Sequence, residues 1–265
     1  MTKPRTETVT GPVVDEVLGT EHPEPDPKRS ASGIWPAPQR PSTVIVDGTE
    51  RPATTYWTSL VRAQAYFESV TADHTMTVLH DVSGPAGSPY RHLRFAAPKS
   101  RFYYFDIVTW PGHLHVGGDF APYTFRRLHD MMDFFNGTGI NPGYWGEKVV
   151  CGQTKDDFDF EVYEEHIRNH LDDASGWYSE SNQALIRDAV HNRLIDLPPT
   201  DEREARELLD DFEVRLPSDR NFQFADTWEW DLGGYSHHFL MSCHAVAYAV
   251  REYRRTYPHR ITAEV

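Results

Sequence analysis

Ionisable side chains recur with a spacing of two between residues 90 and 116, a pattern that could assemble a reaction site. Five of them share this alternation: His92, Arg94, Asp106, His113 and His115. Side chains two apart on a β-strand point to the same side, so strands in register would gather these groups on one face of a sheet. A carboxylate beside imidazoles can tune a general base, and the five residues are therefore candidate catalytic residues.

Two of these histidines could instead bind a metal. His113 and His115, together with Asp119 just beyond them, offer imidazole and carboxylate donors that can hold a divalent ion with open coordination positions. A simpler interpretation needs no ligand, because an antiparallel sheet with one solvated face must carry polar residues there. Catalysis, metal binding and plain solvation are thus three alternatives for the same face, and no other cofactor is indicated.

The elements that must position this face are four predicted strands. They share period-two alternation and a high content of β-branched and aromatic residues: 75–82, 90–97, 101–110 and 113–116. Short links between them favour an antiparallel meander, and the segment Trp110–His113 suits a type II turn with Pro111 and Gly112 at its centre. The opposite parity is apolar and should face a core: Leu93, Phe95, Tyr103, Phe105, Ile107, Leu114 and Val116.

Helical periodicity surrounds this sheet. Apolar residues at three- and four-residue spacing predict six helices: 54–70, 123–135, 161–174, 181–196, 200–213 and 235–257. Their N-caps are expected at Thr54 or Thr55, at Ser179 or Ser181, and at Thr200. Residues 141–146 are expected to form a rigid aromatic loop. A helix, an antiparallel sheet and a mostly helical C-terminal half are typical of α+β proteins, and no alternating βαβ pattern supports a Rossmann-type or barrel fold.

Other histidines and both cysteines have structural alternatives to a chemical role. His166 and His170 lie four apart, as zinc-binding histidines of helices do, but Ile167 stands where the HExxH pattern needs its glutamate. Three histidines of the last helix mark either the boundary of the core or the wall of a site: His237, His238 and His244. Cys151 and Cys243 are expected to be free thiols, with Cys243 buried and inert. Neither a GxxxxGK[ST] phosphate loop nor a GxSxG nucleophile turn occurs.

Negative charge is concentrated in one region of the chain. The 265 residues carry a formal net charge of −14. Residues 156–215 hold 18 Asp and Glu against 6 Lys and Arg, which leaves 22 acidic and 20 basic residues elsewhere. This balance disfavours nonspecific binding to nucleic-acid backbones. The acidic helices are either a solvated surface or a surface that steers the protein onto a basic partner.

Composition also predicts the domain organisation. Residues 1–52 are rich in Pro, Thr and Glu and predict a flexible N-terminal tail, with the alternative of an arm that orders on a partner. Residues 53–265 predict a single α+β domain, with a helix-and-sheet part over 53–150 and an acidic helical part over 151–265. No membrane span and no secretory signal is predicted, so a cytoplasmic location is expected.

Several motifs resemble those of a group of proteins encoded by bacteriophages and prophages. The motifs are FDIVTWPGHL (105–114), Gly118-Asp119 followed by YTF (123–125), DMMDFF (130–135), PGYWGEK (142–148) and HFLMSC (238–243). The resemblance spans roughly residues 90–253 and leaves the tail out. No activity is established for that group, so no catalytic residue carries over. It implies a mobile-element context, in which small accessory proteins often bind and block host machinery.

These observations predict a phage or prophage accessory protein, located in the bacterial host cell. It would bind a host macromolecule with a basic surface through its acidic helices, for example as an inhibitor of a defence or nucleic-acid-processing complex. The alternative is a metal-assisted hydrolase that acts on a nucleotide or nucleic acid through the polar side chains of the sheet, and whether the protein is an enzyme stays open. A third alternative is a structural homo-oligomer that exchanges its tail.

Overall fold

The computed structural model describes residues 43–46, 49–82, 88–100, 102–137, 139–217 and 220–258. Most of the predicted tail and the loop at 83–87 therefore lie outside the described residues. The last part of that tail segment forms an antiparallel hairpin of β1 (Thr43–Val46) and β2 (Thr49–Pro52). Val44 of this hairpin packs against the core, so the packed structure includes residues before position 53.

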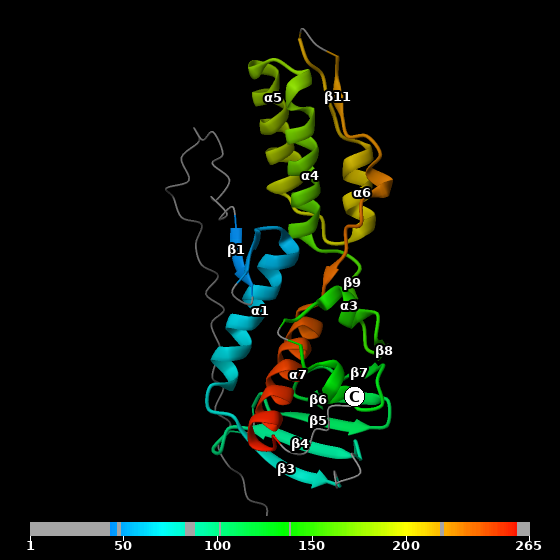
Figure 1. Cartoon of the computed structure of the whole chain (residues 1–265). Helices are drawn as coiled ribbons and strands as arrows, with labels where there is room; N and C mark the ends of the chain where they lie inside the picture. Colours follow the sequence, from blue (N-terminus) through cyan, green and yellow to red (C-terminus); the bar gives the residue numbers. More distant parts are fainter. Residues whose placement is uncertain are drawn as a thin grey trace, which may run out of the picture. The chain divides into compact units, whose positions relative to one another are not determined.

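The fold is α+β, as the sequence predicts, and its centre is a six-stranded antiparallel sheet with the strand order β3-β4-β5-β6-β7-β8 (Figure 1). The strands are β3 (Thr75–Asp81), β4 (Arg91–Ala96), β5 (Phe105–Trp110), β6 (His113–Gly118), β7 (Tyr123–Arg126) and β8 (Val149–Cys151). The first four confirm the predicted meander. Gly112 has φ 79°, as the third position of a type II turn requires, and the turn pairs Trp110 with His113.

The predicted helix over 123–135 is wrong in its first half. Tyr123 and Phe125 are buried in β7, which extends the meander by pairing with β6, and only Met131–Phe134 form a short helix, α2. The hydrogen bonds and buried rings of β7 outweigh a helical spacing that also relied on Leu128, a side chain that the structure leaves exposed. The expected loop at 141–146 is also wrong, because Pro142–Gly146 form a short helix, α3, capped by the side chain of Asn141.

The apolar face of the sheet packs against two helices, α1 (Thr55–Thr71) and α7 (His237–Thr256), which lie side by side (Figure 1). Six of the seven residues predicted to face the core are completely buried: Leu93, Phe95, Phe105, Ile107, Leu114 and Val116. Tyr103 is the exception, because it precedes β5 with φ 61° and is exposed. The sequence places α7 with the acidic helices, but 11 of its residues are buried and nine of these belong to the first core.

The acidic helices form a second core of their own. They are α4 (Phe160–Ala174), α5 (Glu180–Val190) and α6 (Glu202–Asp210), with the small strands β10 (Glu213–Val214) and β11 (Phe222–Gln223) (Figure 1). This core is built from Tyr163, Ile167, Ile186, Val190, Leu194, Ala205, Leu209, Phe212, Leu216, Phe222 and Leu232. The chain enters through β9 (Lys155–Asp156) and returns through β12 (Gly234–Tyr235), which pair antiparallel. We call residues 157–233 the helical insertion.

Capping explains where the helices of the insertion begin. The hydroxyl of Ser179, one of the two predicted alternatives, accepts the N–H of Asn182 at the start of α5. In α6 the cap is Asp201 rather than Thr200, because the Asp201 carboxylate accepts the N–H of Glu204 at 2.8 Å. After α5 the chain continues as a π-helical turn, η2 (His191–Ile195). None of the helices within the described ranges has the length and apolar character needed to cross a bilayer.

Candidate functional site

The polar side of the sheet brings three of the five candidate catalytic residues together. Arg94 on β4 faces Asp106 on β5, and its Nε and one terminal nitrogen donate to the two carboxylate oxygens at 2.8 and 2.7 Å. His92 Nε2 lies 3.3 Å from Asp106 Oδ2. The alternation seen in the sequence therefore produces a His92–Asp106–Arg94 cluster on this polar sheet face.

The cluster leaves Asp106 poorly suited to act as a base. Burial alone would raise the pKa of its carboxyl group, but the hydrogen bonds and charge of Arg94, together with the His92 imidazole 3.3 Å away, outweigh burial and lower the pKa. A carboxylate stabilised in this way holds a proton weakly, and its oxygens already accept hydrogen bonds. The geometry indicates an ion-pair cluster that joins β4 and β5 rather than a group poised for proton transfer.

His115 lies on the next strand and has a separate partner. Its Nδ1 is 3.0 Å from the hydroxyl oxygen of Thr124, and burial lowers the pKa of its imidazole while the charge of Asp106 acts in the opposite direction. A Cβ atom at Gly117 would lie 2.9 Å from His115 Nε2, so the glycine leaves the room that this ring occupies. His115 is thus a neutral, packed histidine at the edge of the cluster.

The structure does not bring the predicted metal ligands together. His113 stacks on Trp110 with 5.0 Å between ring centroids, and its Nδ1 lies 3.0 Å from the carbonyl oxygen of Pro111. Asp119 is exposed, and its backbone N–H donates to Tyr104. Within the described ranges no three His, Cys, Asp or Glu side chains are arranged to hold a metal ion. The arrangement therefore gives no support to a metal-assisted hydrolase at His113, His115 and Asp119.

The sequence missed a fourth histidine of the polar sheet face. The register of β3 shifts between Val78 and His80, so that His80 pairs with His92 although strict alternation would place it on the core side with Val78. His80 is exposed beside the cluster. A one-residue bulge changes the side to which every later side chain points, and the alternating pattern contains no signal for it.

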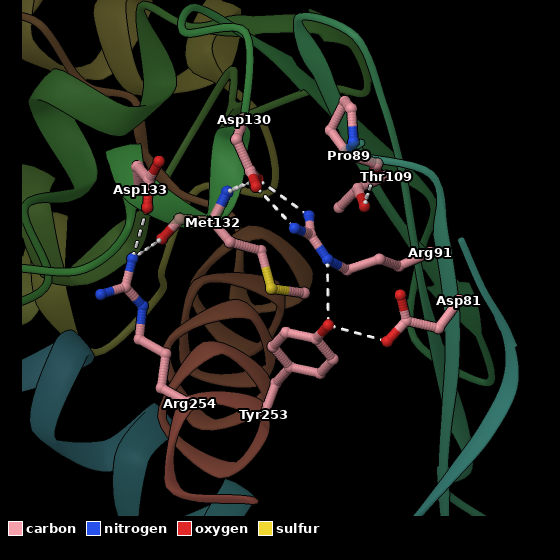
Figure 2. A network of polar contacts seen from close by, with 9 residues as sticks. All are labelled: Asp81, Pro89, Arg91, Thr109, Asp130, Met132, Asp133, Tyr253 and Arg254. Atoms are coloured by element: carbon pink, nitrogen blue, oxygen red, sulfur yellow. Dashed lines mark hydrogen bonds and ion pairs between the residues drawn. The ribbon is translucent and has the colours of Figure 1, made fainter. Parts of the chain in front are cut away.

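A buried arginine network was also missed; it lies on the apolar side of the sheet, with Leu93 and Phe95, and Figure 2 draws its side chains. The Arg91 side chain is fully buried and donates to the two oxygens of Asp130 at 3.0 and 2.7 Å. Its Nε donates to the Tyr253 hydroxyl at 3.3 Å, and this hydroxyl donates to Asp81 at 2.8 Å. The sequence contained one signal for this network: Arg91 has the same parity on its strand as the apolar residues Leu93 and Phe95, which predicts that its side chain faces the core.

This network is a structural device. Burial disfavours the charge of Arg91, but the hydrogen bonds and charge of Asp130, with the help of Tyr253, raise the pKa of the guanidinium. Asp130 Oδ1 also accepts the N–H of Met132 and so caps α2. The network ties the sheet to α7 and to the start of α2, as Figure 2 shows, and each of the three guanidinium nitrogens donates to a protein oxygen.

Three further histidines and the two cysteines have structural surroundings. His166 Nε2 lies 3.1 Å from the Asp231 carbonyl oxygen and its ring stacks on Trp230, whereas burial lowers the pKa of His170 among neighbouring rings. His244 Nε2 lies 3.2 Å from the Leu60 carbonyl oxygen. Both cysteines are free; Cys151 is exposed and burial raises the pKa of the Cys243 thiol, as expected for an inert core residue.

Comparisons of the chain with known proteins found no match. No family model matches the chain, and neither a curated protein nor a solved structure matches it significantly. The geometry of the molecule and the distribution of its charges therefore carry the functional argument.

The segregation of charge becomes sharper when the structure sets the boundaries. The helical insertion holds 21 Asp and Glu against 7 Arg, a net charge of −14, which leaves 19 acidic and 19 basic residues in the rest of the chain. Several exposed carboxylates of the insertion form no ion pair within the described residues: Asp157, Asp172, Asp173, Glu180, Asp188 and Asp211. The whole net charge of the protein thus resides in one independently cored element, which is the strongest candidate for an interaction surface.

One prediction tests the interpretation of the Asp106 cluster. Because its pKa is lower in the folded state, Asp106 stabilises the fold at pH values above the pKa of an unfolded aspartate, about 3.9, and this contribution disappears as the pH falls through the folded pKa. Asp106→Asn should lower the unfolding free energy by about 1 kcal/mol at pH 7, a value reduced for the exposure of Arg94. The difference from the wild type should shrink below about pH 4 in urea titrations. Asp119→Asn, the control at an exposed aspartate, should leave the unfolding free energy at pH 7 within about 0.5 kcal/mol of the wild type.

Proposed function

We propose that the protein binds a basic macromolecular partner through its helical insertion, and that the partner is a protein of a bacterial host cell. The observation that carries this proposal is the confinement of the net charge of −14 to residues 157–233, with a neutral remainder. Such a field accelerates encounter with a positively charged surface and disfavours nucleic acid as a direct ligand.

The local arrangement of the charges supports binding rather than mere solvation. Some acidic residues of the insertion are neutralised by neighbours one helical turn away, as in the pairs Arg203–Glu207 and Arg206–Glu202. The exposed carboxylates of Asp172, Asp188 and Asp211 form no ion pair within the described residues, and Arg168, one turn before Asp172, pairs with Glu164 instead. Unpaired carboxylates repel one another when free, and a basic partner would relieve this repulsion.

The resemblance to phage and prophage proteins suggests which partner class to test. Host complexes that process or defend against nucleic acid present basic surfaces, and an acidic insertion with its own core could occupy such a surface. We therefore propose an inhibitor of a bacterial defence or nucleic-acid-processing complex, acting in the cytoplasm of the host.

The test is salt-dependent capture followed by measurement on the purified partner. The immobilised wild-type protein is incubated with bacterial extract at low salt, and a captured protein is identified and its affinity measured. The triple variant Asp172→Asn, Asp188→Asn, Asp211→Asn should bind this partner about tenfold more weakly. Each peripheral charge contributes roughly 0.5 kcal/mol to the binding free energy, and the three losses together correspond to that factor. Wild-type affinity should fall as salt rises.

A matched control separates the insertion from net charge in general. The control variant, Glu50→Gln, Glu68→Gln, Asp73→Asn, also removes three negative charges, but from exposed positions outside the insertion. Its affinity for the partner should stay within about twofold of the wild type, since distant charges are screened. Equal losses for both variants, or an affinity independent of salt, would refute the proposal.

A further inference from the structure

One groove of the insertion combines exposed aromatic surface with negative charge. It has a volume of about 480 Å³ and lies between the C-terminal end of α4, the 3-10 turn η1 (Ser175–Trp177) and the segment around β11. Trp177 lines it with 70% of its surface exposed. An exposed tryptophan beside a groove is a common anchor point of protein interfaces. We call this site the Trp177 groove.

The walls of the Trp177 groove are built from rings and a carboxylate. His170 packs against Phe224 with 5.2 Å between ring centroids, and both line the groove. Asp173 lines it as well, and its carboxylate is exposed and forms no ion pair in the described part of the chain. Asp226 lies close enough for its charge to act on His170 together with that of Asp173. Aromatic faces flanked by carboxylates are complementary to an organic cation.

The protein itself places a guanidinium on this surface. The Arg220 guanidinium carbon lies 5.5 Å from the ring centroid of Trp177, and Arg220 also lines the groove. Arg220 is exposed and belongs to the same insertion. Its position shows that the indole face can accept a planar cation, and it also shows which group of this chain a competing cation would have to displace.

We propose that the Trp177 groove receives an arginine side chain of the basic protein partner, which displaces Arg220 from the indole and is held by Asp173. This inference rests on the proposed function, because it names the contact by which the partner is recognised. Arginine suits the site better than lysine, because a guanidinium is planar and weakly hydrated and stacks on aromatic rings, whereas an ammonium is compact and strongly hydrated.

The experiment uses two labelled peptides of equal charge, nona-arginine and nona-lysine, and the full chain at low ionic strength. Fluorescence anisotropy should show tighter binding of nona-arginine to the wild type. Trp177→Ala should lower the affinity for nona-arginine about three- to tenfold, the range of a partly exposed cation–π contact. It should change the affinity for nona-lysine by less than about twofold. Trp228→Ala is the matched control, since Trp228 is 73% exposed on the same insertion and does not line the groove.

Arg220→Ala gives a prediction of the opposite sign. Removing the competing guanidinium frees the indole face and makes the net charge of the insertion one unit more negative, so nona-arginine should bind about two- to fivefold more tightly. Weaker binding by this variant would overturn the proposal, as would equal effects of Trp177→Ala and Trp228→Ala or equal affinities of both peptides for the wild type.

The failure of this inference can be told apart from failure of the proposed function. If the triple variant at Asp172, Asp188 and Asp211 weakens both peptides while Trp177→Ala changes neither, the acidic surface binds cations but the groove does not select arginine. If neither peptide responds to the triple variant, the acidic surface itself is not the binding site, and both proposals fall.

Discussion

Asp130→Ala will lower the free energy of unfolding by about 3–5 kcal/mol, because it leaves the buried guanidinium of Arg91 without its counterion. The Arg91 side chain is fully buried and Asp130 is 14% exposed, so water cannot replace the lost oxygens at little cost. The loss of the α2 cap adds about 1 kcal/mol. Urea denaturation followed by circular dichroism measures the change.

Asp133→Ala provides the control for this prediction. Asp133 lies three residues after Asp130 and pairs with Arg254 at 2.7 Å. The side chains of both Asp133 and Arg254 are partly exposed. Its loss should therefore cost only about 0–1 kcal/mol. If the two variants are equally destabilised, Arg91 does not depend on Asp130 for its charge. Arg91→Met combined with Asp130→Leu should recover most of the lost stability, since two apolar side chains remove the buried charge altogether.

The same arginine shows how far sequence patterns reach. Alternation identified four strands and predicted that Arg94 and Asp106 share a face, because only the parity within each strand was needed. Parity also placed Arg91 on the apolar side, but the partner of a buried charge depends on three-dimensional packing. Asp130 lies 39 residues further along the chain and follows a strand that the sequence pattern assigned to a helix.

The errors at β7 and β3 have a common physical origin. In the segment 123–135, apolar residues satisfy a helical spacing and a strand spacing at once, and pairing with the open edge of β6 decides between them. In β3, the bulge before His80 depends on the fit with β4 and leaves no trace in composition. Tertiary pairing therefore determines which histidines and carboxylates meet, which is why the candidate site was only partly predictable.

The boundaries of the helical insertion were equally hidden. The charge count detected an acidic region, but the two short strands that close it, β9 and β12, each have only two residues and lie nearly 80 residues apart. No local pattern distinguishes such strands from loops. Once these strands are known, the whole net charge of −14 falls within the insertion and the remainder is neutral. The same boundaries divide the two hydrophobic cores.

This architecture leads to the second large prediction. Phe212→Ala will destabilise the helical insertion by about 3–5 kcal/mol, because Phe212 is 1% exposed and its removal leaves a cavity in the second core. Its ring lies 5.2 Å from that of Phe224, and the guanidinium of Arg193 lies 4.5 Å from its centroid. Hydrogen exchange should show lost protection of the backbone amides in α4, α5 and α6.

The strands β4, β5 and β6 should keep their protection in the Phe212→Ala variant. The two cores share no buried residue. Within the described residues, the connections between the insertion and α1 or the sheet include the β9–β12 ribbon, the bonds from Thr55 N–H to Glu165 at 2.7 Å and from the Thr55 hydroxyl to the Glu161 carbonyl at 3.3 Å, and the contact of Arg62 with Glu161. Local unfolding follows such boundaries when the interface is weaker than either core. Equal loss of protection in both cores would mean that they unfold as one unit. The reciprocal variant, Leu114→Ala in the first core, should then reduce protection in β4, β5 and β6 first, because a cavity acts on the core that contains it.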